Sequence, residues 1–388
     1  MVKIVALLCS FGLGVCFSLL GAISVKLMPR LRIDQAKFGT LVTGFMTSCL
    51  VASLLMGVIT DRLGYKPVAV FGFVAAGACI FLLARSTSYA AVFGSCLLFG
   101  FGAMALNTAA NTLIPRVLFD GQDAPRALNL GNVAFGVGLL LAPLIASYLF
   151  RIVSYENTVS ALAAIIAVPA VLAVAATYPP QSGAAFEFAN ALSLLAKPAV
   201  VVAFLALFCY SALDVSFSNW LPAFGKEVIG ESRPGADVGA VDASAQRLIS
   251  VYAVAIMVGR LFASQVPGLK EYGGWFLAVA SLAVALLVAW MTWTRRAPVA
   301  WLLVFAVGLI TAPFFPLIVA STFGKFSASP EVHGSVFGII FAGALLGGAT
   351  VPKAIGNLAR GSSVQKSMIL LVPLCLILIG LALVLKGL

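Results

Sequence analysis

One acidic residue, Asp214, stands deep within a long apolar segment of the chain, at residues 199–224. A charged side chain near the centre of a membrane-spanning helix costs about 2.5–3.5 kcal/mol on insertion scales. Such a residue therefore faces a wet cavity, pairs with a base or carries a proton. Two interpretations of Asp214 stay open. It is either a proton-coupling residue or a structural residue that is hydrated or paired with a base such as Lys26.

Amide side chains form a second group of polar residues inside apolar segments. Asn107 and Asn111 are four residues apart, and Asn129 and Asn132 are three apart, so each pair shares one helix face. An amide offers both a donor and an acceptor, which suits a sugar hydroxyl, and aromatic rings suit the apolar face of a pyranose. Hydrogen bonding between membrane helices is the alternative role. The residues we expect to contact a small polar solute are Asn107, Asn111, Asn132, Phe135, Tyr210, Asn219 and Trp220.

Long apolar segments must position these residues. The chain has 388 residues, of which 62% are hydrophobic and only 10% are charged. A soluble domain carries about 25% charged residues, and a helix needs about 20 apolar residues to cross a bilayer, which gives roughly twelve spans here. The expected spans are residues 4–26, 38–60, 67–85, 90–114, 127–150, 158–178, 199–224, 247–266, 274–293, 299–323, 334–351 and 367–386.

Composition and motifs exclude several classes of protein. The apolar runs are continuous rather than alternating, which argues against a membrane β-barrel. The net charge of +11 comes from 24 scattered basic residues without a phosphate-tracking stripe, so no nucleic-acid partner is expected. The sequence contains no phosphate-binding loop and a single histidine, and its seven cysteines lie inside apolar runs. We therefore expect no enzyme, no cofactor and no metal site.

The hydropathy pattern divides the chain near its middle. Residues 179–197 are more polar than their neighbours and leave six spans on each side. We expect an N-terminal six-helix bundle at 1–178, a cytoplasmic linker at 179–197 and a C-terminal six-helix bundle at 198–388, with a solute site at the midplane between the bundles. Two glycine pairs, Gly100 with Gly102 and Gly343 with Gly347, predict close helix packing.

A ten-residue motif joins the second and third spans: Gly57-Val58-Ile59-Thr60-Asp61-Arg62-Leu63-Gly64-Tyr65-Lys66. It resembles the G-x-x-x-D-R-x-G-R-[RK] loop of the major facilitator superfamily, with Tyr65 where a second basic residue is usual. Asp61 is a short acid that can approach a helix N-terminus, where the helix dipole favours negative charge. The resemblance implies a cytoplasmic gate formed by Gly57, Asp61, Arg62, Gly64, Lys66 and Arg126.

The same resemblance sets the orientation. In the superfamily this loop is cytoplasmic, which places both termini of the chain in the cytoplasm. Loop charges mildly oppose that orientation, because more Lys and Arg then fall on the outer side.

Further runs, in both halves and in the expected order, are similar to the fucose permease subfamily of fucose–galactose–glucose:proton symporters. These runs are residues 106–111, 126–132 and 136–138, 208–210, 315–316, and 347–348 with Pro352. The resemblance implies a cavity-facing position for Asn132. Asn107 stands where the subfamily carries a glutamate implicated in proton coupling, and the first span here has no acid. The coupling acids of the subfamily are thus missing, which leaves Asp214 as the candidate replacement.

The sequence therefore predicts an all-α membrane protein with twelve transmembrane helices in two six-helix bundles, the major facilitator fold. The predicted function is secondary active transport of a small polar solute, a monosaccharide, by alternating access with proton coupling. The alternatives are a proton-coupled drug or metabolite exporter, an uncoupled sugar facilitator, and a sugar-binding protein that does not transport. The expected partners are the solute, protons and lipid, the expected oligomeric state is a monomer, and the expected location is a bacterial inner membrane.

Overall fold

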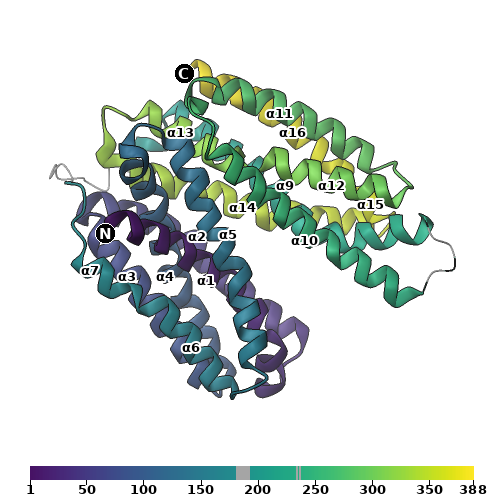
Figure 1. The fold of residues 1–388 in the computed structure, drawn as a ribbon, viewed down its shortest axis with the longest axis horizontal. Helices are drawn as coiled ribbons and strands as arrows, with labels where there is room; N and C mark the ends of the chain where they lie inside the picture. The colour runs from purple at the N-terminus through teal and green to yellow at the C-terminus, as the bar shows by residue number, and fades with distance from the viewer. Residues whose placement is uncertain (181–192, 233–234, 236) are drawn as a thin grey trace. The chain divides into compact units, whose positions relative to one another are not determined.

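The computed structural model describes residues 1–180, 193–232, 235 and 237–388. Every regular element in this described part is a helix (Figure 1). The predicted linker at 179–197 lies largely outside the described residues. The helices are α1 (Val2–Leu31), α2 (Gln35–Leu63), α3 (Tyr65–Arg85), α4 (Tyr89–Val117), η1 (Leu118–Gly121), α5 (Ala124–Leu149), α6 (Tyr155–Ala167), α7 (Pro169–Ala175), α9 (Pro198–Ser232), α10 (Val238–Ala263), α11 (Leu269–Met291), α12 (Ala297–Thr311), α13 (Phe314–Lys325), η2 (Pro330–Val332), α14 (His333–Ala359), α15 (Val364–Ser367), η3 (Met368–Leu370) and α16 (Leu371–Gly387).

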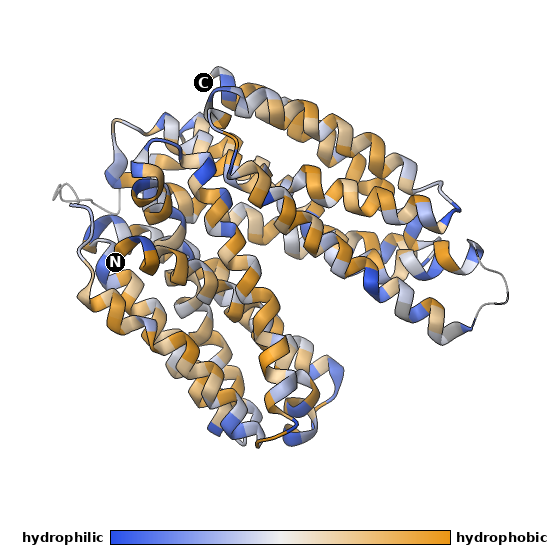
Figure 2. Ribbon diagram, viewed as in Figure 1, coloured by the Kyte–Doolittle hydropathy of each residue, from blue (hydrophilic) through white to orange (hydrophobic). Residues whose placement is uncertain are grey.

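Within the described residues these elements form twelve segments that are long and apolar enough to cross a membrane, and some of the segments join two or more consecutive helices, as α6 with α7 and α12 with α13. Hydrophobic residues run along the helices, and hydrophilic residues gather at the helix ends and connections (Figure 2). A helix satisfies its backbone hydrogen bonds internally, which is what a bilayer interior demands of a spanning segment. The prediction of an all-helical membrane protein with twelve spans is confirmed.

Local sequence signals explain where the helices begin. Side-chain oxygens of Asp34, Ser88, Asp123 and Ser154 accept hydrogen bonds from backbone N–H groups in the first turns of α2, α4, α5 and α6. These residue types are preferred at N-caps because they satisfy otherwise unbonded donors at the helix start.

Prolines break two of the predicted spans, which corrects the sequence-based boundaries. The predicted span 158–178 is two helices, α6 and α7, with Pro169 as the first residue of the second. The predicted span 299–323 is also divided, into α12 and α13, and Pro313 lies between them. A proline inside a helix removes a backbone donor and clashes with the preceding turn, so the helix is interrupted there.

The polar segment after the seventh predicted span is mostly helical rather than a long loop. The sequence pattern ends that span at residue 224, whereas α9 continues to Ser232 and α10 begins at Val238. The side chain of Asp237 accepts a hydrogen bond from the amide of Ala240 and so caps α10. Hydropathy underestimated both helices because their outer turns are polar and extend beyond the apolar window.

Two compact units make up the chain. The first contains Met1–Leu195 together with Phe326–Ile339, and the second contains Ala196–Lys325 together with Ile340–Leu388. Helix α14 therefore contributes its first turns to the first unit and the rest of its length to the second.

Glycines allow close helix crossings inside each unit. In the first unit α1 packs on α5, where Gly14 meets the backbone of Phe135 so closely that a Cβ would overlap it. In the second unit Gly343 and Gly347 of α14 face the backbone of α9 in the same way. Small residues are the usual means by which membrane helices approach, because lipid provides no hydrophobic drive for their association. The packing role predicted for the Gly343–Gly347 pair agrees with this contact.

Candidate functional site

The acidic residue of the predicted gate motif binds the beginning of another helix in the first unit. Asp61 lies in the last turn of α2 and is buried. Its Oδ1 accepts a hydrogen bond from the amide of Gly334 at 2.7 Å, and its Oδ2 accepts one from the amide of Ser335 at 2.6 Å. These amides belong to the first turn of α14, where the helix dipole is positive, so the carboxylate stabilises that helix start.

Glycine brings the two helices together at this point. A Cβ on Gly57 would overlap the carbonyl of Gly334, and a Cβ on Gly334 would overlap the carbonyl of Gly57. One helical turn on, Gly338 faces the backbone of Ser53 in the same way. We call this crossing of α2 with the first turns of α14 the α2–α14 seam. The motif therefore supplies both the carboxylate and the space that the carboxylate needs to reach its donors.

A basic residue that the sequence interpretation did not select lies beside the seam. The guanidinium of Arg116, at the end of α4, donates to the carbonyl of Pro330 in η2. It also lies over the ring of Tyr65, at 5.3 Å from its centroid. Arg116 thus fixes the segment that leads into α14 and holds a positive charge near Asp61.

The basic residues that the sequence assigned to the gate, Arg62, Lys66 and Arg126, have other surroundings than Arg116. The side chains of Arg62 and Lys66 are exposed. Arg126 lies over the ring of Phe119 at 4.3 Å, and its Nε is 4.0 Å from the carboxylate of Asp123.

The glycine that ends α2 has a backbone conformation which L residues rarely adopt. Gly64 has φ +93° and is the single residue between α2 and α3. Its positive φ makes the tight connection possible.

The amide pair of α4 is buried and bonded to itself. The side chains of Asn107 and Asn111 are 1% and 6% exposed. Asn111 Nδ2 donates to Asn107 Oδ1 at 2.8 Å and to the Asn107 carbonyl at 3.0 Å. The two residues therefore share one helix face, as their spacing predicts, and part of their hydrogen-bonding capacity is used within α4.

The residues indicated on α5 are less buried. Asn132 is partly exposed, and its Nδ2 donates to the carbonyl of Leu128 at 2.8 Å, which leaves its oxygen available as an acceptor. The ring of Phe135 lies one turn further on and packs edge-to-face with Phe17 at 6.3 Å. Asn129 is fully buried and bonds the carbonyl of Pro125. Of the first unit's indicated residues, Asn132 and Phe135 are thus the more accessible.

The second unit holds a cluster of charged and phenolic side chains around Asp214. Tyr252 of α10 donates its hydroxyl to Asp214 Oδ1 at 3.0 Å. Arg260 lies about two turns beyond Tyr252 on α10. It donates from Nη2 to the hydroxyl of Tyr210 at 3.3 Å and from Nε to the carbonyl of Ala312 at 3.3 Å. We call Tyr210, Asp214, Tyr252 and Arg260 the α9–α10 cluster.

Burial and charge set the character of this cluster. Tyr210, Tyr252 and Arg260 are buried, with 5%, 2% and 7% exposed, whereas Asp214 is partly exposed. Arg260 lies close enough to Asp214 for their charges to interact. Charges attract more strongly at this depth than in water because the effective dielectric constant is lower. The arrangement holds a partly exposed carboxyl group beside a hydroxyl donor and a nearby cation.

The remaining indicated residues on α9 have different environments. Asn219 is exposed. Trp220 donates its Nε1–H to the carbonyl of Pro352 at 2.9 Å, and its ring faces Gly356, where a Cβ would stand 2.8 Å from it. These contacts give Trp220 a role in holding α9 to α14.

Arg260 was available to sequence reasoning but was not selected. It lies well inside the predicted span 247–266, where a base is as costly as the acid at Asp214. Pairing the acid in one span with the base in the next would have identified it. Tyr252 carried no such signal, because a tyrosine is ordinary in an apolar helix.

The fold of the described residues, with its twelve candidate spans, is that of a polytopic membrane protein. The sequence model of the Major Facilitator Superfamily matches residues 6–352, and the chain belongs to that family. It is accordingly a secondary transporter and an integral membrane protein.

Known proteins resemble the chain at low sequence identity. The synaptic vesicular amine transporter of Homo sapiens is 21% identical over 364 residues, which cover 89% of this chain and 67% of the relative. The transporter of the same name from Mus musculus is 21% identical over 339 residues, which cover 84% of this chain and 62% of the relative. The chain thus spans about two thirds of the length of these relatives.

Solved structures share the fold. A crystal structure of the Major Facilitator Superfamily transporter FucP in the outward conformation has a TM-score of 0.79 and 18% identity, with 99% of each chain covered. The E. coli fucose:proton symporter FucP has a TM-score of 0.75 and 19% identity, with 98% of each chain covered. The human organic anion transporter MFSD10 has a TM-score of 0.73 and 17% identity, with 98% of each chain covered. The major facilitator fold expected from the motif at residues 57–66 is therefore confirmed.

Proposed function

We propose that this transporter moves a small polar, sugar-like solute by alternating access, and that Asp214 carries a coupling proton. The observation that carries the proposal is the α9–α10 cluster. It combines a partly exposed carboxyl group inside a membrane-spanning helix with a tyrosine donor at 3.0 Å and a buried arginine nearby.

The cluster supplies the opposing forces that reversible protonation requires. A carboxyl group inside the membrane is favoured in its neutral form by loss of hydration, whereas a nearby cation and a hydroxyl donor favour its ionised form. When these forces nearly balance, a small change in the distance to Arg260 or Tyr252 changes proton occupancy. A conformational change of the transporter would thereby bind or release a proton.

The amides and aromatic rings support a solute with hydroxyl groups. Asn132 keeps an amide oxygen as an acceptor beside the ring of Phe135, and Tyr210 places a phenol in the α9–α10 cluster. Such groups match the hydroxyls and the apolar face of a sugar. The likeness of the fold to FucP, whose substrate is given as fucose, supports the same solute class.

Alternating access also requires contacts that break. We propose that the α2–α14 seam is such a contact. The seam depends on two hydrogen bonds from the amides of Gly334 and Ser335 to Asp61 and on a glycine crossing. In this proposal the seam is cytoplasmic, both termini are cytoplasmic, and the protein acts as a monomer in a bacterial inner membrane.

A second function is favoured by a different observation. The curated relatives are vesicular amine transporters, and Asp214 would also suit a cationic amine. A proton-coupled amine or drug exporter is therefore the competing candidate.

Transport by the purified protein separates these functions. Proteoliposomes are tested for uptake of a panel of labelled monosaccharides, with and without an inward proton gradient. They are also tested for uptake of labelled serotonin that is driven by an outward proton gradient. We expect accumulation of at least one sugar that requires the gradient. Sugar equilibration without accumulation would overturn coupling and leave a facilitator. Serotonin accumulation without sugar uptake would overturn the sugar proposal and support the exporter.

A further inference from the structure

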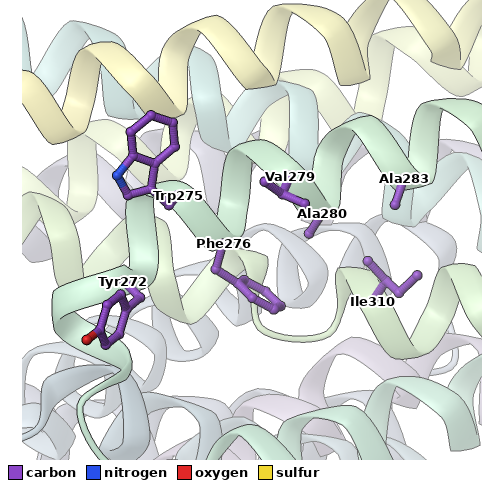
Figure 3. Close-up of a pocket in the computed structure, with 7 residues that line it drawn as sticks. All are labelled: Tyr272, Trp275, Phe276, Val279, Ala280, Ala283 and Ile310. Carbon is purple, nitrogen blue, oxygen red and sulfur yellow. The ribbon is translucent and has the colours of Figure 1, made fainter.

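An apolar groove opens on the surface of the second unit, along α11 and α12 (Figure 3). Its volume is about 430 Å³. All of its lining residues lie outside the polar clusters described above. They are Tyr272, Trp275, Phe276, Val279, Ala280, Ala283 and Ile310.

The shape of the groove suits a single hydrocarbon chain. Small side chains at Ala280 and Ala283 leave the space, and the exposed side chains of Phe276 and Val279 stand beside it. Along α11 the lining runs from Tyr272 to Ala283, which is about 16 Å at 1.5 Å per residue. That length equals about half of the 30 Å hydrocarbon thickness of a bilayer, the depth of one leaflet.

One end of the groove carries the features of a membrane interface. The amphipathic rings of Tyr272 and Trp275 stand at this end and are 68% and 54% exposed. Tyrosine and tryptophan favour the headgroup level of a bilayer because one part of each ring is apolar and the other is polar. The rest of the lining, towards Ala283, is apolar.

Positive charge is concentrated at the same end. The ammonium group of Lys386 lies over the ring of Trp275, 4.6 Å from its centroid. The ammonium group of Lys325 donates to the backbone carbonyl of Lys386 at 3.3 Å, so a second lysine reaches the same end of α16. Glu271, in the first turn of α11, carries the opposite charge and reduces the positive balance without cancelling both lysines.

We propose that this groove binds an anionic phospholipid, with an acyl chain along α11 and the phosphate held by Lys386 and Lys325. Basic residues between membrane helices bind acidic headgroups, and each lysine near an anionic surface contributes about 1 kcal/mol. That contribution equals about a five-fold preference for each lysine. The site does not depend on the solute or on the proposed proton coupling.

Native mass spectrometry of the full-length, delipidated protein tests the proposal. The probes are palmitoyl-oleoyl phosphatidylglycerol and the zwitterionic phosphatidylcholine with the same acyl chains. Variants K325Q, K386Q and A283L are compared with K353Q, which removes an exposed lysine elsewhere on the second unit. Circular dichroism and a thermal melt confirm that each variant is folded.

The wild-type protein should bind phosphatidylglycerol at least five-fold more tightly than phosphatidylcholine. K386Q and K325Q should each reduce that preference about five-fold, K353Q should leave it unchanged, and A283L should weaken both lipids by filling the groove. Equal binding of the two lipids, or a preference that survives in the K325Q/K386Q double variant, would overturn the headgroup assignment. Unchanged binding to A283L, or occupation of the groove by a second copy of the chain in cross-linking, would overturn the groove as the lipid site.

Discussion

The substitution Asp61→Asn tests the physical account of the α2–α14 seam. The wild-type carboxylate accepts two backbone hydrogen bonds, at 2.7 and 2.6 Å, from the start of α14. An asparagine can accept only one of them through its oxygen, because its NH₂ group faces the other donor. Hydrogen bonds to charged groups are worth about 1.5–3 kcal/mol, and loss of the negative charge at a helix N-terminus costs about 0.3–1 kcal/mol more. The seam should therefore weaken by about 2–4 kcal/mol.

Amide hydrogen exchange measures this weakening of the α2–α14 seam directly. Protection of the Gly334 and Ser335 amides depends on local opening of the seam, and about 1.4 kcal/mol corresponds to a ten-fold change in rate. Exchange at these two amides should thus rise about 30-fold or more in the variant, measured by mass spectrometry of the peptide that contains them. Opening elsewhere in the protein should change little.

The control is the same substitution at another helix cap. Asp34 caps α2 by accepting a hydrogen bond from the amide of Lys37 at 2.8 Å. Asparagine caps helices about as well as aspartate, so Asp34→Asn should leave exchange at Gly334 and Ser335 unchanged. Equal exchange at those amides in Asp61→Asn and the wild type would refute the argument that the carboxylate holds the seam closed.

Three further predictions concern other contacts. Gly57→Ala should lower stability by about 1–3 kcal/mol because its Cβ overlaps the Gly334 carbonyl; an unchanged midpoint in a detergent thermal melt would contradict the close crossing. Glu227→Gln should lower stability by about 1–2 kcal/mol because the carboxylate accepts two hydrogen bonds of 2.8 Å from the start of α15, and chemical denaturation with an unshifted midpoint would count against this cap. Tyr252→Phe should reduce gradient-driven accumulation while solute counterflow persists, since it removes the hydroxyl that donates to Asp214; loss of counterflow would instead indicate a role in solute binding.

The spans could be predicted from the sequence because bilayer thickness and backbone hydrogen bonding leave so few solutions. Long apolar runs required twelve helices, and the glycine pair Gly343 and Gly347 indicated a close crossing. The exact ends of the helices could not be predicted, because the outer turns of α9 are polar and because proline interrupts the helix at Pro169 and Pro313 but lies inside α4 at Pro115. Hydropathy averages over such local features.

The candidate site could be predicted only in part. Asp214 stood out because an acid in an apolar span is rare, but its donor Tyr252 is a common residue and lies 38 positions away in the sequence. The motif identified Asp61 as an acid that can approach a helix N-terminus. Nothing in the sequence specified that the backbone amides of Gly334 and Ser335 would supply the hydrogen-bond donors. Long-range pairings of this kind depend on tertiary contacts, which single-chain patterns do not contain.

The most direct test of the central claim compares Asp214→Asn with the wild type in proteoliposomes, using the sugar that the wild type accumulates. Asp237→Asn serves as the control, because it changes an exposed helix cap in the same unit. The account predicts that Asp214→Asn still exchanges labelled sugar in counterflow but no longer accumulates it against its gradient, whereas Asp237→Asn does both. Accumulation by Asp214→Asn at the wild-type level would contradict the assignment of Asp214 as the residue that carries the proton.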